Sequence, residues 1–149
     1  MAKFYVALAE NKVYPMPDSN KVFVKFGKTR HTDAADRFDE SVDDGYDKNY
    51  YDWDFKIKFS KYGTDQEVTD LESYWLNEQF PYDGYTKVWV EQYLGCDDGH
   101  KYKDVSGITE LRLLTKKQYA WVLRQCYDSL TPEEVQAKEA RRKKYAVTN

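Results

Sequence analysis

The chain has 149 residues, a formal net charge of −3 at pH 7 and an aromatic content of 17%. Tyrosine is the most frequent of its aromatic residues. This length suits one domain with its own core. The negative charge excludes a strongly basic protein that coats DNA, but it leaves a local basic groove open. No apolar run is long enough to cross a bilayer, and the N-terminus lacks the apolar segment of a signal peptide. We therefore expect a cytoplasmic protein without a membrane partner.

Two strands are predicted near the N-terminus. Residues 4–9 form a short apolar run that is typical of a buried strand, and residues 11–20 hold two prolines that favour a loop. The alternation of Val22, Val24 and Phe26 with their neighbours predicts a second strand with one face mostly buried, paired antiparallel with the first. Gly27 is expected to end this strand at a turn and to leave room for close approach of another group.

The segment after Gly27 combines basic side chains with a predicted helix start. Thr32 or Asp33 can cap a helix, and residues 43–51 are acidic, rich in tyrosine and predicted to form an exposed loop. By composition alone, the basic side chains here fit an ordinary solvated surface. They are Lys25, Lys28, Arg30, His31 and Arg37.

A third strand and a capped helix follow. Residues 53–59 alternate aromatic or aliphatic with charged side chains, which predicts an outer strand with one dry and one wet face. Thr64 and Glu67 form a capping-box pattern at the start of a helix. Glu72 lies at the edge of the apolar stripe of this helix, beside Trp75, where a carboxylate must be partnered or used because burying it alone is costly. A functional role and a simple pair with a lysine are both consistent with this position.

The rest of the chain is predicted to hold two more strands, at residues 87–94 and 108–114, and two more helices. Glu110 and Arg112 would share one face of the second strand and could form an ion pair. A core helix is expected after Thr115 and a last helix after Thr131, acidic at its start and basic at its end as the helix dipole favours. Cys126 lies on the apolar face of the core helix, which indicates a buried free thiol rather than a metal ligand.

Five pieces of the sequence together resemble the GIY-YIG nuclease superfamily, in the phage and fungal branch whose second motif reads Lys-hydrophobic-Gly. The similarity extends over residues 3–125. The pieces are Lys3-Phe4-Tyr5, Lys25-Phe26-Gly27-Lys28-Thr29, Arg37-Phe38, the helix segment 71–76 with Glu72, and the segment 107–111. The resemblance implies an α+β fold, with a small antiparallel or mixed sheet flanked by helices in residues 1–130 and a helical extension in residues 131–149.

The resemblance also implies a DNA endonuclease or nicking enzyme that depends on Mg²⁺ or Mn²⁺. Glu72 would hold the metal, which prefers carboxylate and water oxygens. Tyr5 would contact or deprotonate the attacking water, and Arg37 would stabilise the phosphate. Lys25 stands where many members have tyrosine, and its ammonium group would lower the pKa of Tyr5 or bind phosphate. Lys28, Arg30 and His31 would contact nucleic acid beyond the glycine.

A second hypothesis keeps the scaffold but not the catalysis. Fold does not fix function, and an acidic, tyrosine-rich surface suits protein partners. In this case the chain would be an accessory protein, for instance of a bacteriophage, that binds a host protein or nucleic acid in the host cytoplasm. The composition, rich in Tyr, Lys and Asp, suits a virulent phage genome.

Overall fold

A four-stranded antiparallel sheet with helices packed on it forms the α+β fold that the sequence predicts. The computed structural model describes residues 2–11, 16–29, 53–84, 86, 88–89 and 108–146. The strand order is β3-β1-β2-β4, so the predicted first strand is central and the predicted outer strand lies at an edge. The strands are β1 (Ala2–Asn11), β2 (Lys21–Thr29), β3 (Trp53–Gly63) and β4 (Leu111–Thr115).

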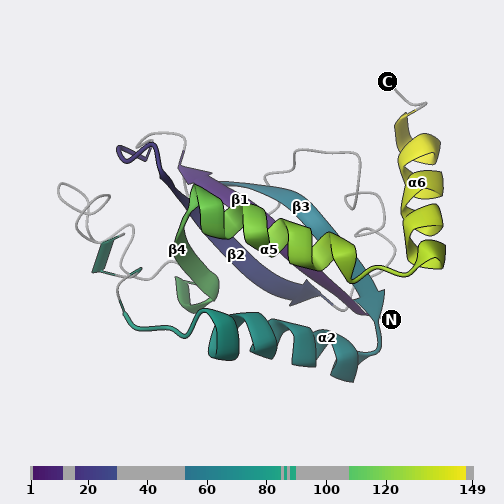
Figure 1. Cartoon of the computed structure of the whole chain (residues 1–149), viewed down its shortest axis with the longest axis horizontal. Coiled ribbons are helices and arrows are strands. Elements are labelled where there is room, and N and C mark those ends of the chain that lie inside the picture. Colours follow the sequence, from purple (N-terminus) through teal and green to yellow (C-terminus); the bar gives the residue numbers. More distant parts are fainter. Residues whose placement is uncertain are drawn as a thin grey trace.

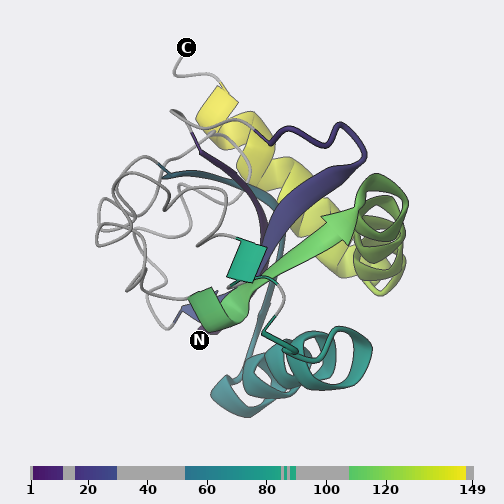
Figure 2. The ribbon, with the colours of Figure 1, turned by 90° about the vertical axis from the view of Figure 1, so that its left-hand side faces the viewer.

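The helices α2 (Asp65–Ser73) and α5 (Lys116–Asp128) lie on the same face of the sheet, as Figures 1 and 2 show from two sides. A π-helical segment, Tyr74–Gln79, continues α2, and α6 (Pro132–Ala146) follows α5 near the end of β3. Among the described residues, no helix has the length and apolar character needed to cross a membrane.

Both faces of the sheet are buried, which differs from the prediction of one wet face. One core cluster lies under α2 and α5 and includes Phe4, Val24 and Val122. A second cluster lies on the opposite face and includes Phe23 and Phe55. Because burial on the second face depends on what the fold packs there, alternation within one strand could not reveal it.

The prediction that Gly27 ends its strand is wrong. The strand β2 runs on to Thr29, and Gly27 pairs with Tyr5 of β1 inside the sheet. The predicted close approach at Gly27 is confirmed, because a Cβ atom built there would lie 2.4 Å from both Cζ and Oη of Tyr5. The glycine thus provides space for a side chain rather than a turn of the backbone.

A bulge in β3 explains why its apolar residues do not share one face. Val6 pairs with Phe59 and Ala7 pairs with Ile57, so Lys58 is the extra residue on β3. Phe59 therefore packs in the cluster under α5, whereas Phe55 and Ile57 belong to the opposite cluster. The hydroxyl of Tyr127 on α5 donates to the carbonyl oxygen of Lys58 at 2.5 Å, which ties the bulge to the helix.

Three of the predicted helix starts, at Thr64, Thr115 and Thr131, are confirmed as reciprocal side-chain caps. Thr64 and Glu67 form a capping box at α2, and Thr115 and Gln118 form another at α5. At the start of α6, the hydroxyl of Thr131 accepts from the backbone N–H of Glu134, and the Glu134 carboxylate accepts from the backbone N–H of Thr131, each at 3.1 Å. These caps satisfy backbone groups that the first turn leaves open.

The predicted strand at residues 87–94 is wrong where the structure describes it. Thr86, Val88 and Trp89 are helical, and the backbone N–H of Val88 donates to the carbonyl of Gly84 at 3.0 Å. The Thr86 hydroxyl accepts from the backbone N–H of Leu113 at 3.1 Å, on the edge of β4. The segment therefore protects this edge with a side chain instead of adding a strand.

The segment from Ile108 to Leu114 is a strand only in part, since Ile108–Glu110 form a 3₁₀ turn and β4 begins at Leu111. The expected pairing of Glu110 with Arg112 along one strand does not form, because Glu110 lies outside the strand. The guanidinium of Arg112 instead donates to four backbone carbonyl groups of its own and neighbouring segments. These acceptors are Leu76, Phe80, Thr109 and Leu111, at 2.5 to 3.1 Å.

The predicted buried thiol is confirmed, because Cys126 is 4% exposed and free, and burial raises the pKa of its thiol to about 12. The helix α6 meets β3 through the ammonium group of Lys138, which is buried and donates to the Ser60 hydroxyl at 2.9 Å. The predicted helix after Thr32 and the predicted loop at residues 43–51 lie outside the described residues.

Candidate functional site

Tyr5 and Gly27 form the centre of the candidate site. Tyr5 lies on the central strand β1, is 5% exposed and packs with the core cluster opposite α5. Its ring and hydroxyl cross directly over Gly27 of β2, in the space that any other residue would fill with its side chain. The first two pieces of the GIY-YIG resemblance, which are far apart in the sequence, are therefore in contact through these two residues.

Lys25 lies beside Tyr5 on the same face of the sheet. Tyr5 pairs with Gly27 and Ala7 pairs with Lys25, so Tyr5 and Lys25 are diagonal neighbours, about 7–8 Å apart in such a pair and within reach of long side chains. The side chain of Lys25 is buried, and its Nζ lies 5.5 Å from the centroid of the Phe55 ring. A buried ammonium group requires a partner, and the Glu110 carboxylate provides one at 3.6 Å.

Glu110 is the functional candidate that sequence reasoning missed. Lys25 pairs with Leu111 across the β2–β4 ladder, and this register brings the preceding residue, Glu110, to the ammonium group. The signal was present in the segment 107–111 that carries the resemblance. The sequence pattern predicts instead an ion pair of Glu110 with Arg112 on one strand, because it does not reveal the 3₁₀ turn before β4.

Glu72, on α2, lies in the electrostatic field of the same groups. Burial raises the pKa of its carboxyl group above the usual value, and the negative charge of Glu110 raises it further. The positive charges of Lys28 and Lys25 act in the opposite direction and lower it. Groups from β2 and from the turn before β4 thus influence one half-buried carboxylate on α2, as the position of Glu72 at the edge of an apolar stripe suggested.

Lys28 approaches α2 from the end of β2. Its Nζ donates to the Thr69 hydroxyl at 3.1 Å, one turn before Glu72, and the lysine itself remains exposed. Lys28 and Lys25 thus both act on Glu72 from positions on either side of Gly27. Of the other predicted site residues, Arg30, His31 and Arg37 lie outside the described residues.

The donors of the described residues fit a hard cation held by few protein ligands. No group of three His, Cys, Asp or Glu side chains within the described ranges could hold a metal ion. Mg²⁺ does not need such a cage, because it is often held by one or two carboxylates, waters and substrate phosphates. A half-buried carboxylate with a raised pKa, close to a second carboxylate, gains from the positive charge of such an ion.

In comparisons with known proteins, no family model, no curated protein and no solved structure matches this chain. The described residues themselves provide three chemical elements, two on the sheet face of Tyr5 and one on α2, which packs on the other face. These are a phenol held over a glycine, a buried ammonium group paired to Glu110, and the half-buried carboxyl group of Glu72.

Proposed function

We propose that this protein is a small metal-dependent endonuclease or nicking enzyme that hydrolyses DNA phosphodiester bonds. One observation carries the proposal: the ring of Tyr5 lies over Gly27, with Lys25 beside it and Glu72 in the electrostatic field of Lys25 and Lys28. The GIY-YIG resemblance pairs the same residues for hydrolysis, although they come from three separate elements. A chance resemblance in sequence would give no reason for Lys25 to lie beside Tyr5 and to act on Glu72.

The residues suit the separate demands of phosphodiester hydrolysis. Tyr5 can orient or deprotonate the attacking water, and the ammonium group of Lys25 lies beside it on the same face of the sheet. Glu72 would hold Mg²⁺ or Mn²⁺, which supplies positive charge for the phosphate and the leaving oxygen. Lys28 is exposed beside Gly27 and can contact the DNA backbone, while Arg37, Arg30 and His31 remain predicted contacts.

A specific observation favours the second candidate, a catalytically inactive protein that binds a host protein or nucleic acid. Tyr5 is 5% exposed, Lys25 is 4% exposed, and the charge of Lys25 is compensated by Glu110. Buried and paired groups of this kind also serve to specify a core. In this alternative, the tyrosine, the lysine and the glycine are retained for the packing of the sheet.

Plasmid nicking separates the two candidates. We expect the purified protein to convert supercoiled plasmid to open circles in the presence of Mg²⁺ or Mn²⁺. EDTA should stop this conversion, because the Glu72 carboxylate cannot supply the positive charge of the ion. A parallel purification from cells that lack the gene controls for contaminating nucleases. Folded protein that leaves the plasmid intact with either metal rejects the nuclease proposal, and a partner retained at high salt would then favour the protein-binding candidate.

A further inference from the structure

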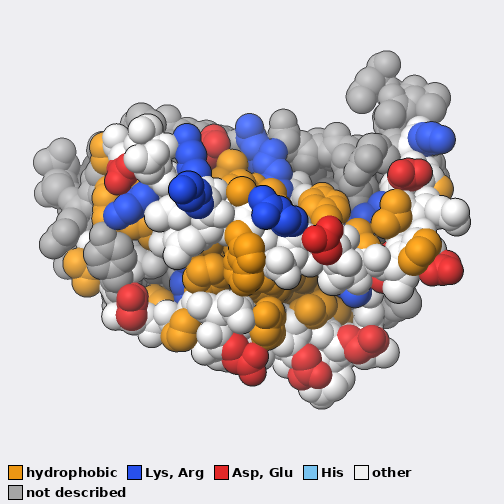
Figure 3. Space-filling view, in the orientation of Figure 1, with side chains coloured by type: hydrophobic (Ala, Val, Ile, Leu, Met, Phe, Trp, Pro, Cys, Tyr) orange, Lys and Arg blue, Asp and Glu red, His pale blue; other side chains and the backbone are white. Residues whose placement is uncertain are grey.

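A groove runs between α5 and the helix formed by α2 and its π-helical segment, on the sheet face away from Tyr5. Figure 3 shows hydrophobic side chains along it, between the two helices. One hollow has a volume of about 210 Å³, with Phe4 and Phe59 of the sheet among its lining residues. A second, more open hollow lies between Phe80 and Lys117, near the start of α5.

The two hollows are two helical turns apart. Gln125 of α5 lines the first hollow and Gln118 lines the second, so about 10 Å separates them along the helix at 1.5 Å per residue. Between them, the rings of Trp75 and Trp121 meet edge to face with centroids 5.8 Å apart. A helix lying in the groove with large apolar residues at positions i and i+7 would therefore place one side chain in each hollow.

The two helical segments beside the groove have opposite net charges. The segment Asp65–Gln79 holds five acidic residues and no basic one, whereas α5 holds three basic residues and one acidic one. Figure 3 shows the result as blue side chains over α5 and red side chains over α2. A helix that matches both walls must be acidic on one flank and basic on the other, with its apolar face toward the sheet.

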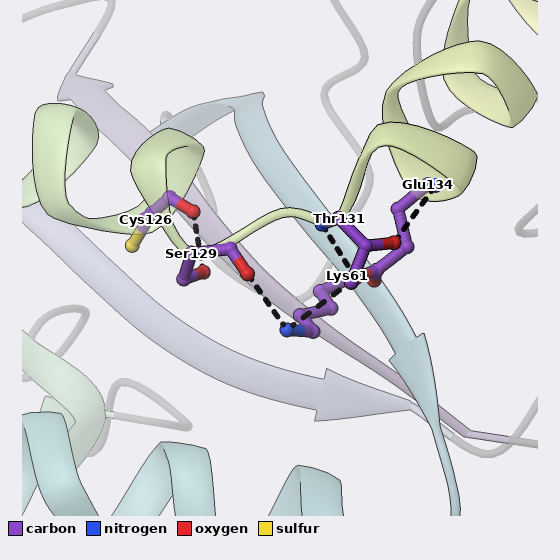
Figure 4. Close-up of polar contacts among 5 residues, drawn as sticks. All are labelled: Lys61, Cys126, Ser129, Thr131 and Glu134. Carbon is purple, nitrogen blue, oxygen red and sulfur yellow. Dashed lines mark hydrogen bonds and ion pairs between the residues drawn. The ribbon is translucent and has the colours of Figure 1, made fainter.

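Lys61 and Ser129 line the first hollow, and Figure 4 shows the polar contacts that they make. The Nζ of Lys61 lies 3.5 Å from the backbone oxygen of Ser129 and 3.7 Å from the carboxylate of Glu134. At the rim, Tyr74 is 38% exposed and Trp121 is 37% exposed, and such half-exposed aromatic side chains commonly anchor a partner.

We propose that this groove binds an amphipathic helix of a partner protein, with apolar residues at i and i+7, an acidic flank against α5 and a basic flank against α2. The groove shares its α2 wall with Glu72 of the proposed nuclease site, whereas its hollows lie on the sheet face opposite Tyr5 and Lys25. The proposal assigns to the chain a protein-binding surface of defined charge and spacing.

A synthetic helical peptide of about 14 residues, which spans about 20 Å, tests the proposal. It carries leucine at i, i+3, i+7 and i+10, one acidic and one basic flank, and a fluorescent label for anisotropy. If the two charged flanks of the peptide were exchanged, the peptide could restore the match by lying in the opposite direction. The charge test is therefore made by changing the protein. We expect one-to-one binding, at least tenfold weaker in the double variant Lys117→Glu, Arg124→Glu, and unchanged in Lys143→Glu on α6, where the side chain is exposed.

A second variant tests the hollow itself. Gln125 is exposed on α5, so Gln125→Trp leaves the core intact and fills the hollow, and binding should weaken at least tenfold with an unchanged melting temperature. Absence of peptide binding, or equal affinity in all these variants, overturns the proposal. It is also overturned if sedimentation shows that the chain dimerises and Gln125→Trp prevents this, because a second copy would then occupy the groove. Plasmid nicking measured on the same variants keeps this outcome separate from that of the nuclease proposal.

Discussion

Replacing Glu72 by Gln will lower metal-dependent plasmid nicking at least 100-fold and leave the melting temperature of the protein unchanged or higher. The loss in rate corresponds to about 2.7 kcal/mol of transition-state stabilisation, a moderate value for the removal of a metal-binding carboxylate. The amide has the shape of the carboxyl group but no negative charge, so it cannot compensate the charge of Mg²⁺.

The direction of the stability effect follows from the pKa of Glu72. Burial and the charge of Glu110 raise this pKa in the folded protein, so the ionised form is less favourable there than in the unfolded chain. The ionised carboxylate therefore destabilises the folded state, and a neutral amide relieves that cost. A group that costs stability and supports activity has the profile of a functional residue.

Asp70→Asn is the matched control for Glu72→Gln, since it makes the same change of charge on the same helix. The Asp70 side chain is exposed and accepts only a hydrogen bond from Gln66 at 2.8 Å among the contacts that the described residues show. We expect this variant to nick plasmid at the wild-type rate. If both variants retain the wild-type rate, or both lose it equally, Glu72 has no special role in cleavage.

Replacing Gly27 by Ala will destabilise the protein by about 3 kcal/mol, measured by chemical denaturation, because the new methyl group overlaps the ring of Tyr5. The added Cβ would lie 2.4 Å from Cζ and Oη of Tyr5 and 2.9 Å from Cε2. The ring cannot simply swing away, since Tyr5 is 5% exposed and packed among the residues of the second core cluster.

Gly63→Ala and a double variant show whether this clash is the cause. At Gly63, an added Cβ comes no closer than 3.3 Å to its neighbours, which are atoms of the Glu67 side chain, so the cost should stay within about 1 kcal/mol. In a Tyr5→Ala background, Gly27→Ala should also cost less than about 1 kcal/mol, which gives a large coupling energy. An equal cost of Gly27→Ala with and without the Tyr5 ring would mean that the ring does not lie over the glycine.

Much of the fold could be predicted because its signals are local. Each of the capping patterns at Thr64, Thr115 and Thr131 spans only four residues of sequence. Each of these three helices begins where its pattern predicts. The buried runs of β1 and β2 and the edge position of β3 were likewise predicted. The bulge at Lys58 was not, because an extra residue in one strand is defined only by its pairing with another.

The errors have the same physical origin. The apolar and aromatic residues of 87–94 suit a strand as well as a helical turn, and the described residues Thr86, Val88 and Trp89 are helical, with the Thr86 hydroxyl bonded to the edge of β4. The pairing of Lys25 with Glu110 depends on the register between β2 and β4, which no single segment encodes.

The candidate site could be predicted only in part from the sequence. Tyr5, Lys25, Lys28 and Glu72 were singled out, and their neighbourhood depends on sheet register and helix packing. Burial of Tyr5 and Lys25 could not be foreseen, since it arises from the second core cluster on that face. The place of Arg37, Arg30 and His31 relative to these residues stays a prediction.

The central claim is that Glu72 and Tyr5 belong to one metal-dependent site. An anomalous X-ray difference map, calculated from crystals of the protein soaked in Mn²⁺, measures this most directly because it locates the ion independently of activity. We predict a Mn²⁺ peak bonded to the Glu72 carboxylate, in a space that the Tyr5 hydroxyl also faces. Mn²⁺ bound elsewhere with none at Glu72, or Glu72 and Tyr5 opening onto separate surfaces, would contradict the account.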